Sequence, residues 1–224
     1  MKHLFILCLS FLISTADAQQ AIRFINLTGT AEHIVDADEI VFNIQVRTTA
    51  KSLDEAKKKN DEQISNIRKI LAELNIKKDD FEIHPISLGK EYEWQNNKRV
   101  DKGFFAATNV TFKLKDFSRY YEATDKLASS DNFTVNSYYN LSNFEFYNKT
   151  TYQKALIAAK EKAEYMTKAL NINIGKVLEI EETGDYQPPM LMRNKMEMDS
   201  ASGETIAGKI TIRKSIRIKF ELID

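Results

Sequence analysis

The last segment of the chain restricts the fold most, because its side chains alternate strictly between apolar and polar. Between residues 206 and 222 the apolar side chains occupy even positions, and only Gly208 and Lys214 interrupt that face. Such alternation predicts a strand with one face buried. At about 3.3 Å per residue, a straight strand of this length would exceed ~50 Å. We therefore expect a bend or a bulge near Gly208 or Lys214.

Strand patterns and amphipathic helix patterns alternate along the rest of the chain. The strand patterns cover residues 22–27, 40–46, 81–94, 106–114, 133–146 and 176–181. The helix patterns cover residues 53–75, 117–129 and 150–170. Polar side chains occupy the second face of two strands, which are Asn43 and Gln45 on one strand and Asn109, Thr111 and Lys113 on the other. We predict an α+β fold with a largely antiparallel sheet, two long helices and one shorter helix packed against it, and loosely duplicated strand-strand-helix units.

Local signals mark the ends and buried faces of these elements. Ser52-Leu53-Asp54-Glu55 is a capping box that begins the first helix, and its buried stripe includes Asn60. Thr28-Gly29-Thr30 is interpreted as the break after the first strand. The stripe of the longest helix contains three small residues, which predict close approach to a sheet or to another helix. These residues are Ala155, Ala159 and Ala163.

The first 18 residues have the features of a secretory signal peptide. Lys2 precedes the apolar run Leu4–Ile13, which is too short for a membrane anchor, and Ala16-Asp17-Ala18 fits a cleavage site. The only cysteine, Cys8, lies in this signal, so the exported chain has no thiol or disulfide chemistry. We expect a single periplasmic domain of residues 19–224, with residues 183–204 as a loop between the last two strands. The extracellular space is the alternative location.

Charge gives no reason to expect nucleic acid as a partner. The chain has 32 Lys and Arg residues against 32 Asp and Glu residues, so its formal net charge is zero. No segment after the signal has the apolar length of a membrane helix. We expect no transmembrane segment in the exported chain, and peripheral association with an outer membrane is an alternative that the sequence leaves open.

No local motif predicts an active site, a cofactor or a resident metal. His33 and His84 have no second ligand at metal-binding spacing, so both are interpreted as structural or surface residues. The acidic group Glu32, Asp36, Asp38 and Glu39 lacks the dense spacing and central glycine of a calcium loop, and a solvated turn is the better interpretation. We expect no enzyme activity; a hydrolase site assembled from distant residues is the weakest hypothesis.

A cluster of methionines is the one unusual constellation. It lies in the expected loop and contains Met190, Met192, Met196 and Met198. The first interpretation is an adaptable apolar surface that packs against a partner. The alternatives are reversible oxidation to sulfoxides and binding of Cu(I) by soft thioether ligands. Asp199-Ser200-Ala201 also fits a short O-glycosylation signal of exported proteins, with Ser200 as the acceptor.

The chain resembles the SIMPL-domain family of exported bacterial proteins. The resemblance depends on the order and spacing of several segments, which are Leu27–Glu32, Asn60, Leu71–Ile76, Ala155–Ala163 and Ile174–Val177. Lys154 stands where the family often has Arg, and Asn171 or Asn173 stands where it often has Gly. The resemblance implies a periplasmic or outer-membrane-associated protein, with links to oxidative-stress defence and ring-like oligomers in some members. It supplies no enzyme mechanism.

Together these observations predict an exported, non-enzymatic scaffold or interaction protein of the cell envelope. We expect partners among other copies of the chain and other envelope proteins. The long final strand and the loop over residues 183–204 are the surfaces expected to self-associate, because exposed strand edges pair readily. The alternative is a protein that binds a soft metal or small ligand through its methionine-rich loop.

Overall fold

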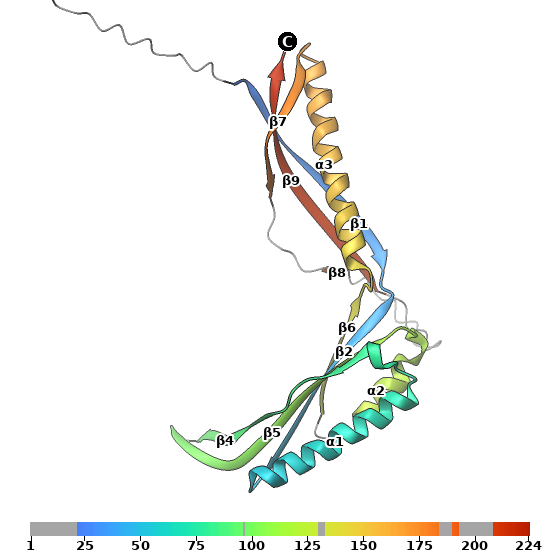
Figure 1. The fold of residues 1–224 in the computed structure, drawn as a ribbon, viewed down its shortest axis with the longest axis vertical. Coiled ribbons are helices and arrows are strands. Elements are labelled where there is room, and N and C mark those ends of the chain that lie inside the picture. The colour runs from blue at the N-terminus through green and yellow to red at the C-terminus, as the bar shows by residue number, and fades with distance from the viewer. Residues whose placement is uncertain (1–21, 96, 130–132, 184–189, 193–207) are drawn as a thin grey trace, which may run out of the picture.

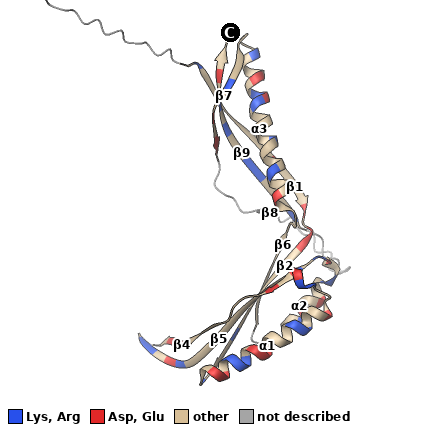
Figure 2. Ribbon diagram, in the orientation of Figure 1, with Lys and Arg blue, Asp and Glu red and all other residues tan. Residues whose placement is uncertain are grey.

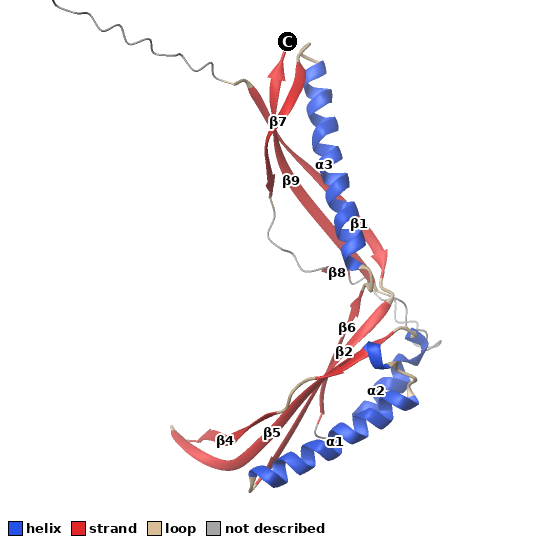
Figure 3. Ribbon diagram, in the orientation of Figure 1, coloured by secondary structure: helices blue, strands red, loops and turns tan. Residues whose placement is uncertain are grey.

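Two lobes joined end to end form the molecule (Figure 1). The computed structural model describes residues 22–95, 97–129, 133–183, 190–192 and 208–224. The elements are β1 (Phe24–Asp36), β2 (Glu39–Ala50), α1 (Leu53–Glu73), β3 (Phe81–Ile83), β4 (Ser87–Gln95), β5 (Lys98–Leu114), α2 (Tyr120–Ala128), β6 (Phe133–Asn140), α3 (Phe144–Lys168), β7 (Asn173–Glu182), β8 (Met190–Met192) and β9 (Lys209–Ile223). Short 3-10 turns lie at Lys78–Asp80 and Phe117–Arg119. Helices and antiparallel strands therefore confirm the α+β prediction, with two long helices and one short one (Figure 3).

The chain builds the two lobes in an interrupted order. β1 belongs to one sheet, the order of which is β1-β9-β7 with β8 also paired to β9. The segment from β2 to β6 then forms the other sheet, the order of which is β3-β5-β2-β6 with β4 also paired to β5. We call the first the α3 lobe and the second the α1 lobe, after the long helix of each. All pairings are antiparallel within the described strands.

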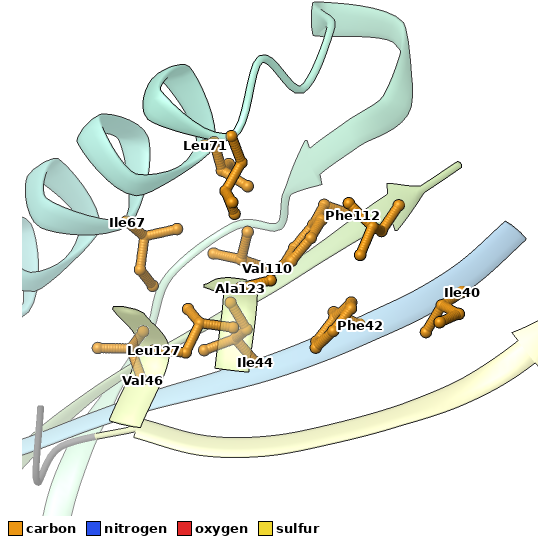
Figure 4. Close-up of a cluster of buried hydrophobic side chains, with 12 residues drawn as sticks. Ile40, Phe42, Ile44, Val46, Ile67, Leu71, Val110, Phe112, Ala123 and Leu127 are labelled. Atoms are coloured by element: carbon orange, nitrogen blue, oxygen red, sulfur yellow. The ribbon is translucent and has the colours of Figure 1, made fainter. Parts of the chain in front are cut away.

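The α1 lobe has a core of large side chains between α1, α2 and the sheet (Figure 4). The rings of Phe42 and Phe112 stack with centroids 4.6 Å apart, and Ile67 and Leu71 of α1 are fully buried above the strands. The predicted capping box is confirmed in its first half, since the Ser52 hydroxyl accepts a hydrogen bond from the Glu55 amide at 3.2 Å. Burial of such side chains is the main stabilising term for the lobe.

A buried amide completes the contact between α1 and its sheet. The Asn60 side chain donates to the carbonyl oxygens of Val46 and Ala106 at 3.3 and 3.2 Å, and it accepts from the Thr108 hydroxyl at 2.7 Å. Asn60 has no exposed surface. These bonds satisfy a polar group that would otherwise be costly to bury. They fix the position of α1 over the paired strands β2 and β5.

In the α3 lobe the long helix contributes small residues to the core, whereas the sheet contributes Ile216, Ile218 and Phe220. Ala155, Ala159 and Ala163 are fully buried against the sheet, as their spacing predicts. At Gly29 an added Cβ would lie 2.2 Å from the Ala155 carbonyl oxygen and 2.7 Å from the Ala159 Cβ. The interpretation of Thr28-Gly29-Thr30 as a break is wrong, because β1 continues through it. The glycine allows α3 to approach the strand closely.

The final strand is central in its sheet and not an exposed edge. β9 pairs with β1 on one side, from Phe24 opposite Glu221 to Asp36 opposite Lys209, without a register shift. β7 and β8 cover its other side, so the expected self-association through this strand's own edge is wrong. The predicted bulge near Lys214 is also absent from the described pairing, and the register shifts lie on the β7 side, around Val177.

Two further boundaries differ from the sequence prediction. β6 ends at Asn140 and α3 begins at Phe144, so the second half of the predicted strand over residues 133–146 is helical or connecting. Aromatic side chains in this stretch favour a strand locally, but they pack as a helix start against the neighbouring core. Within the expected loop, Met190–Met192 forms β8, which pairs with Lys209–Thr211.

A packed joint connects the lobes. The Asp38 carboxylate accepts hydrogen bonds from the Ser142 amide at 2.7 Å and from its hydroxyl at 2.6 Å. The Ala37 amide donates to the Gly208 carbonyl at 2.9 Å. An added Cβ at Gly208 would lie 2.7 Å from the Tyr139 ring, so the backbone at Gly208 lies close against this ring. A small core that includes Ala37, Leu141, Ile210 and Ile212 fills the joint.

Candidate interaction surfaces

Within the described part of the chain, each sheet carries helical structure on one face and no helix on the other (Figure 1). Basic and acidic side chains are interspersed over both lobes and do not collect into a field of one sign (Figure 2). No described helix is long and apolar enough to cross a membrane. The features that distinguish one surface from another are therefore strand edges and the uncovered sheet faces.

β1 presents the longest free edge of the α3 lobe. It pairs with β9 along one side, and its other side has no strand partner among the described strands. Its sequence contains no lysine and no proline, and its pairing with β9 is regular over all 13 residues. Phe24 and Ile34 on this strand are 51% and 49% exposed. A long, regular edge with exposed apolar side chains is suited to pairing with another strand.

Of the other outer strands, β7 and β4 carry features that oppose pairing, whereas β6, with eight residues, pairs regularly with β2, has no charged residue and is shorter than β1. β7 has two register shifts and contains Lys176 and three glutamates. β4 has a register shift between Glu91 and Tyr92, and it also contains Lys90 and Glu93. Charges and bulges are the devices by which edge strands are kept from pairing. The contrast singles out β1 among the long edges.

The uncovered face of the α1-lobe sheet holds a recess of about 450 Å³. Uncharged polar side chains from β2, β5 and β6 line it, and these are Asn43, Gln45, Asn109, Thr111, Thr134 and Asn136. His84, which follows β3, lies on its border. Sequence alternation placed the β2 and β5 side chains on polar faces, but it gave no sign that the strands join to form one recess.

The two histidines occupy separate lobes. His33 contacts the ring of Tyr147 edge-on at 5.2 Å between centroids, and its Nδ1 is buried without a hydrogen-bond partner. The His84 amide donates to the Asn109 carbonyl at 2.9 Å, and its Nε2 lies 3.5 Å from the Thr111 hydroxyl. The two histidines therefore do not form a common site.

The acidic group around the joint is divided among different partners. Glu32 accepts from Arg213 at 2.6 Å, and Asp36 lies 3.6 Å from Lys209. Asp38 binds Ser142, as described above. Glu39 is 1% exposed and accepts from the Asn140 amide at 2.6 Å. The solvated-turn interpretation is wrong for Glu39, because the joint buries it. No cluster of three metal-binding His, Cys, Asp or Glu residues occurs within the described ranges.

The displaced pKa values belong to structural contacts. A hydrogen bond from Arg119 lowers the pKa of Glu122, and a hydrogen bond to Glu73 raises the pKa of Lys126. Burial raises the pKa of Tyr139, which packs in the joint. Arg119 also donates to the Leu74 carbonyl at 2.5 Å. The contacts of Arg119 and Lys126 join α2 and the turn before it to the end of α1.

The methionine cluster is only partly placed. Met190 and Met192 belong to β8, whereas Met196, Met198 and the glycosylation candidate Ser200 lie outside the described residues. Copper binding, oxidation and packing by this cluster stay predictions, as does glycosylation at Ser200.

A two-lobed α+β protein with an unprotected strand edge and a polar recess is the class that these observations define. The sequence model of SIMPL, described as a protein of unknown function (DUF541), matches residues 25–220. The chain belongs to the SIMPL family. The comparison with curated proteins finds no match.

Proposed function

We propose that the chain is an exported, non-enzymatic scaffold of the cell envelope that self-associates through the free edge of β1. The observation that carries this proposal is the unpaired side of β1, a regular strand of 13 residues. Backbone N–H and C=O groups along such an edge form hydrogen bonds with a strand from another molecule. Other envelope proteins that present a free strand could pair with β1 through the same backbone hydrogen bonds.

The structure supports β1 and not β9 as the pairing strand. β9 is paired on both sides, whereas β1 combines a free edge with the exposed side chains of Phe24 and Ile34. Pairing between identical chains produces a closed oligomer when the same contact repeats around a symmetry axis. Pairing of β1 with β1 of a second copy closes a dimer, so the ring-like oligomers that the family resemblance implies require β1 to pair with a different edge of the next copy.

Export to the periplasm is part of the same proposal. It depends on the signal-like segment over residues 1–18, with a chain that begins at Gln19. A contribution to oxidative-stress resistance, and peripheral association with an outer membrane, are proposed from the family resemblance alone. Cell fractionation and N-terminal sequencing of the expressed protein test the location.

Light scattering on residues 19–224 over a range of protein concentrations tests the self-association. We expect a defined oligomer for the wild type and a monomer for Thr30→Lys/Ile34→Lys, because lysines on an edge strand oppose pairing. The control is Gln153→Lys/Ile157→Lys, which also adds two lysines, one of them in place of an isoleucine, at exposed positions of α3. The control should keep the wild-type mass.

Each other outcome contradicts part of the proposal. A wild-type monomer at all concentrations rules out self-assembly, and an edge variant with the wild-type mass rules out β1 as the contact. The soft-metal alternative is tested separately by Cu(I) titration of the wild type and of a variant with Leu at Met190, Met192, Met196 and Met198. Equal affinity for the two would reject it.

A further inference from the structure

We propose that the recess on the uncovered face of the α1-lobe sheet binds a short uncharged glycan. The juxtaposition that carries this inference is the meeting of amide and hydroxyl side chains from three adjacent strands in one hollow of about 450 Å³. That volume lies within the range of sites for small ligands. The inference goes beyond the scaffold proposal and does not depend on it.

Strand pairing brings these side chains together. Asn43 of β2 lies opposite Thr111 of β5 on one side and opposite Asn136 of β6 on the other. Gln45 likewise lies between Asn109 and Thr134. Directly opposite residues point to the same face of a sheet. Two successive rows of three polar side chains therefore form a continuous floor.

Much of the hydrogen-bonding capacity of this floor is unused within the molecule. The Thr111 hydroxyl donates to Asn43 Oδ1 at 3.0 Å. The side chains of Gln45, Asn109, Thr134 and Asn136 form no hydrogen bond with any other described side chain or backbone group. Amides present both donors and acceptors, and hydroxyl groups do so as well. A ligand with many hydroxyl groups matches this mixture because each of its hydroxyls both donates and accepts.

The charge pattern favours an uncharged ligand over an ionic one. The six floor residues are all neutral, in a chain of which 29% is charged. Charged side chains lie at the border of the floor: Glu82 of β3 lies opposite Thr111 and is 3.6 Å from His84, Arg47 binds Glu91, and Lys113 lies 3.6 Å from Glu39. An anionic ligand would lose solvation at this floor without gaining an opposite charge. An uncharged sugar needs no opposite charge at the floor.

An aromatic side chain lies further along β6, beyond the residues that line the recess. Tyr138 follows Asn136 by two residues on β6, so it points to the same face, and it is 46% exposed. Aromatic rings offer an apolar surface next to a polar group. The apolar face of a sugar ring can pack on Tyr138 while its hydroxyls contact the amides. The sheet thus provides both of the surfaces that a saccharide presents.

The test uses residues 19–224 and three uncharged sugars, chitotetraose, cellotetraose and maltotetraose, with a sulfated oligosaccharide as the anionic comparison. Saturation-transfer NMR detects binding and calorimetry measures its affinity. We expect binding of at least one uncharged sugar, with an affinity that does not change as salt is raised, because no ion pair is involved. The sulfated sugar should not bind at the recess.

The variant Thr134→Val/Asn136→Val removes two floor side chains, and affinity should fall about tenfold or more. Its matched control is Asn173→Val/Thr183→Val, which makes the same changes of residue type at the start of β7 and just after its end, in the other lobe and away from β1. No binding of any uncharged sugar, binding of the sulfated sugar alone, or equal losses in the two variants would each overturn the proposal. A change of oligomer mass in the floor variant, with no sugar binding by the wild type, would assign the face to a second copy instead.

Discussion

The two lobes attach a long helix to an antiparallel sheet in opposite ways. α1 lies on its sheet through large side chains such as Ile67 and Leu71, with Asn60 as a buried polar anchor. α3 lies on its sheet through a row of alanines that reaches down to Gly29. The α1 lobe is therefore held by the volume that its side chains fill. The α3 lobe is held by contacts that only small residues permit.

This difference predicts opposite sensitivities to substitution. Removing atoms from a filled core loses transfer free energy and leaves a cavity. Adding atoms to a close contact forces the backbone or the neighbouring side chains to move. The α1 lobe should be most sensitive to truncation, and the contact between β1 and α3 should be most sensitive to enlargement. Amide hydrogen exchange measures the opening free energy of each segment, so comparing each variant with the wild type shows which lobe has lost stability.

The largest effect is expected for Phe112→Ala in the α1 lobe. Phe112 is fully buried and stacked on Phe42, so its loss should lower the free energy of unfolding by about 3–5 kcal/mol. Denaturation with urea measures the change. The matched truncation is Leu156→Ala on α3, where the side chain is only partly buried, and it should cost less. Equal costs would show that the α3 lobe also depends on filled volume.

How well the sequence predicts each lobe follows from the same difference. The stripe of α1 and the alternation of β9 are local patterns, and both elements form where those patterns place them. Gly29 was misinterpreted because its role depends on α3, which lies more than a hundred residues further along the chain. A glycine that allows close approach and a glycine that ends a strand look the same in sequence.

The surfaces were harder to predict than the elements. The alternation of β9 shows a half-buried strand, but it does not show which strands pair beside it, so the central position of β9 could not be inferred. The sequence pattern predicts only six residues for the first strand, whereas β1 has 13. The additional residues are strand because they pair with β9, which lies at the other end of the chain. Asn43 and Asn136 are likewise far apart in sequence and adjacent in the sheet.

The next effect is expected for Gly29→Ala in the α3 lobe. The new methyl group would overlap the Ala155 carbonyl oxygen and the Ala159 side chain, and we expect a loss of about 3 kcal/mol. The control is Gly89→Ala, where the added Cβ would meet only the ring of Phe105 at 2.8 Å, and a ring can turn aside. The same urea measurement should show a smaller loss there. Equal losses would mean that helix contact is not the cause.

A smaller effect is expected for Asn60→Leu in the α1 lobe. This change removes the amide that donates to the carbonyls of Val46 and Ala106 and the oxygen that accepts from the Thr108 hydroxyl, and we expect a loss of about 2 kcal/mol in the free energy of unfolding. The comparison is Thr151→Val on α3. Thr151 is equally buried, but its hydroxyl donates to Tyr147 of its own helix at 2.7 Å and does not connect helix to sheet. A Thr151→Val loss as large as that of Asn60→Leu would contradict the role of Asn60 as an anchor between layers.

The smallest effect concerns how the two helices begin. The Ser52 hydroxyl caps α1, so Ser52→Ala should lower the free energy of unfolding by about 1 kcal/mol. Asn143 stands at the same position of α3, but its side chain makes no capping hydrogen bond. Asn143→Ala should therefore cost less than Ser52→Ala in parallel urea denaturation. If the two costs are equal, the helices do not differ in their starts, and the contrast between the lobes is confined to how each helix packs on its sheet.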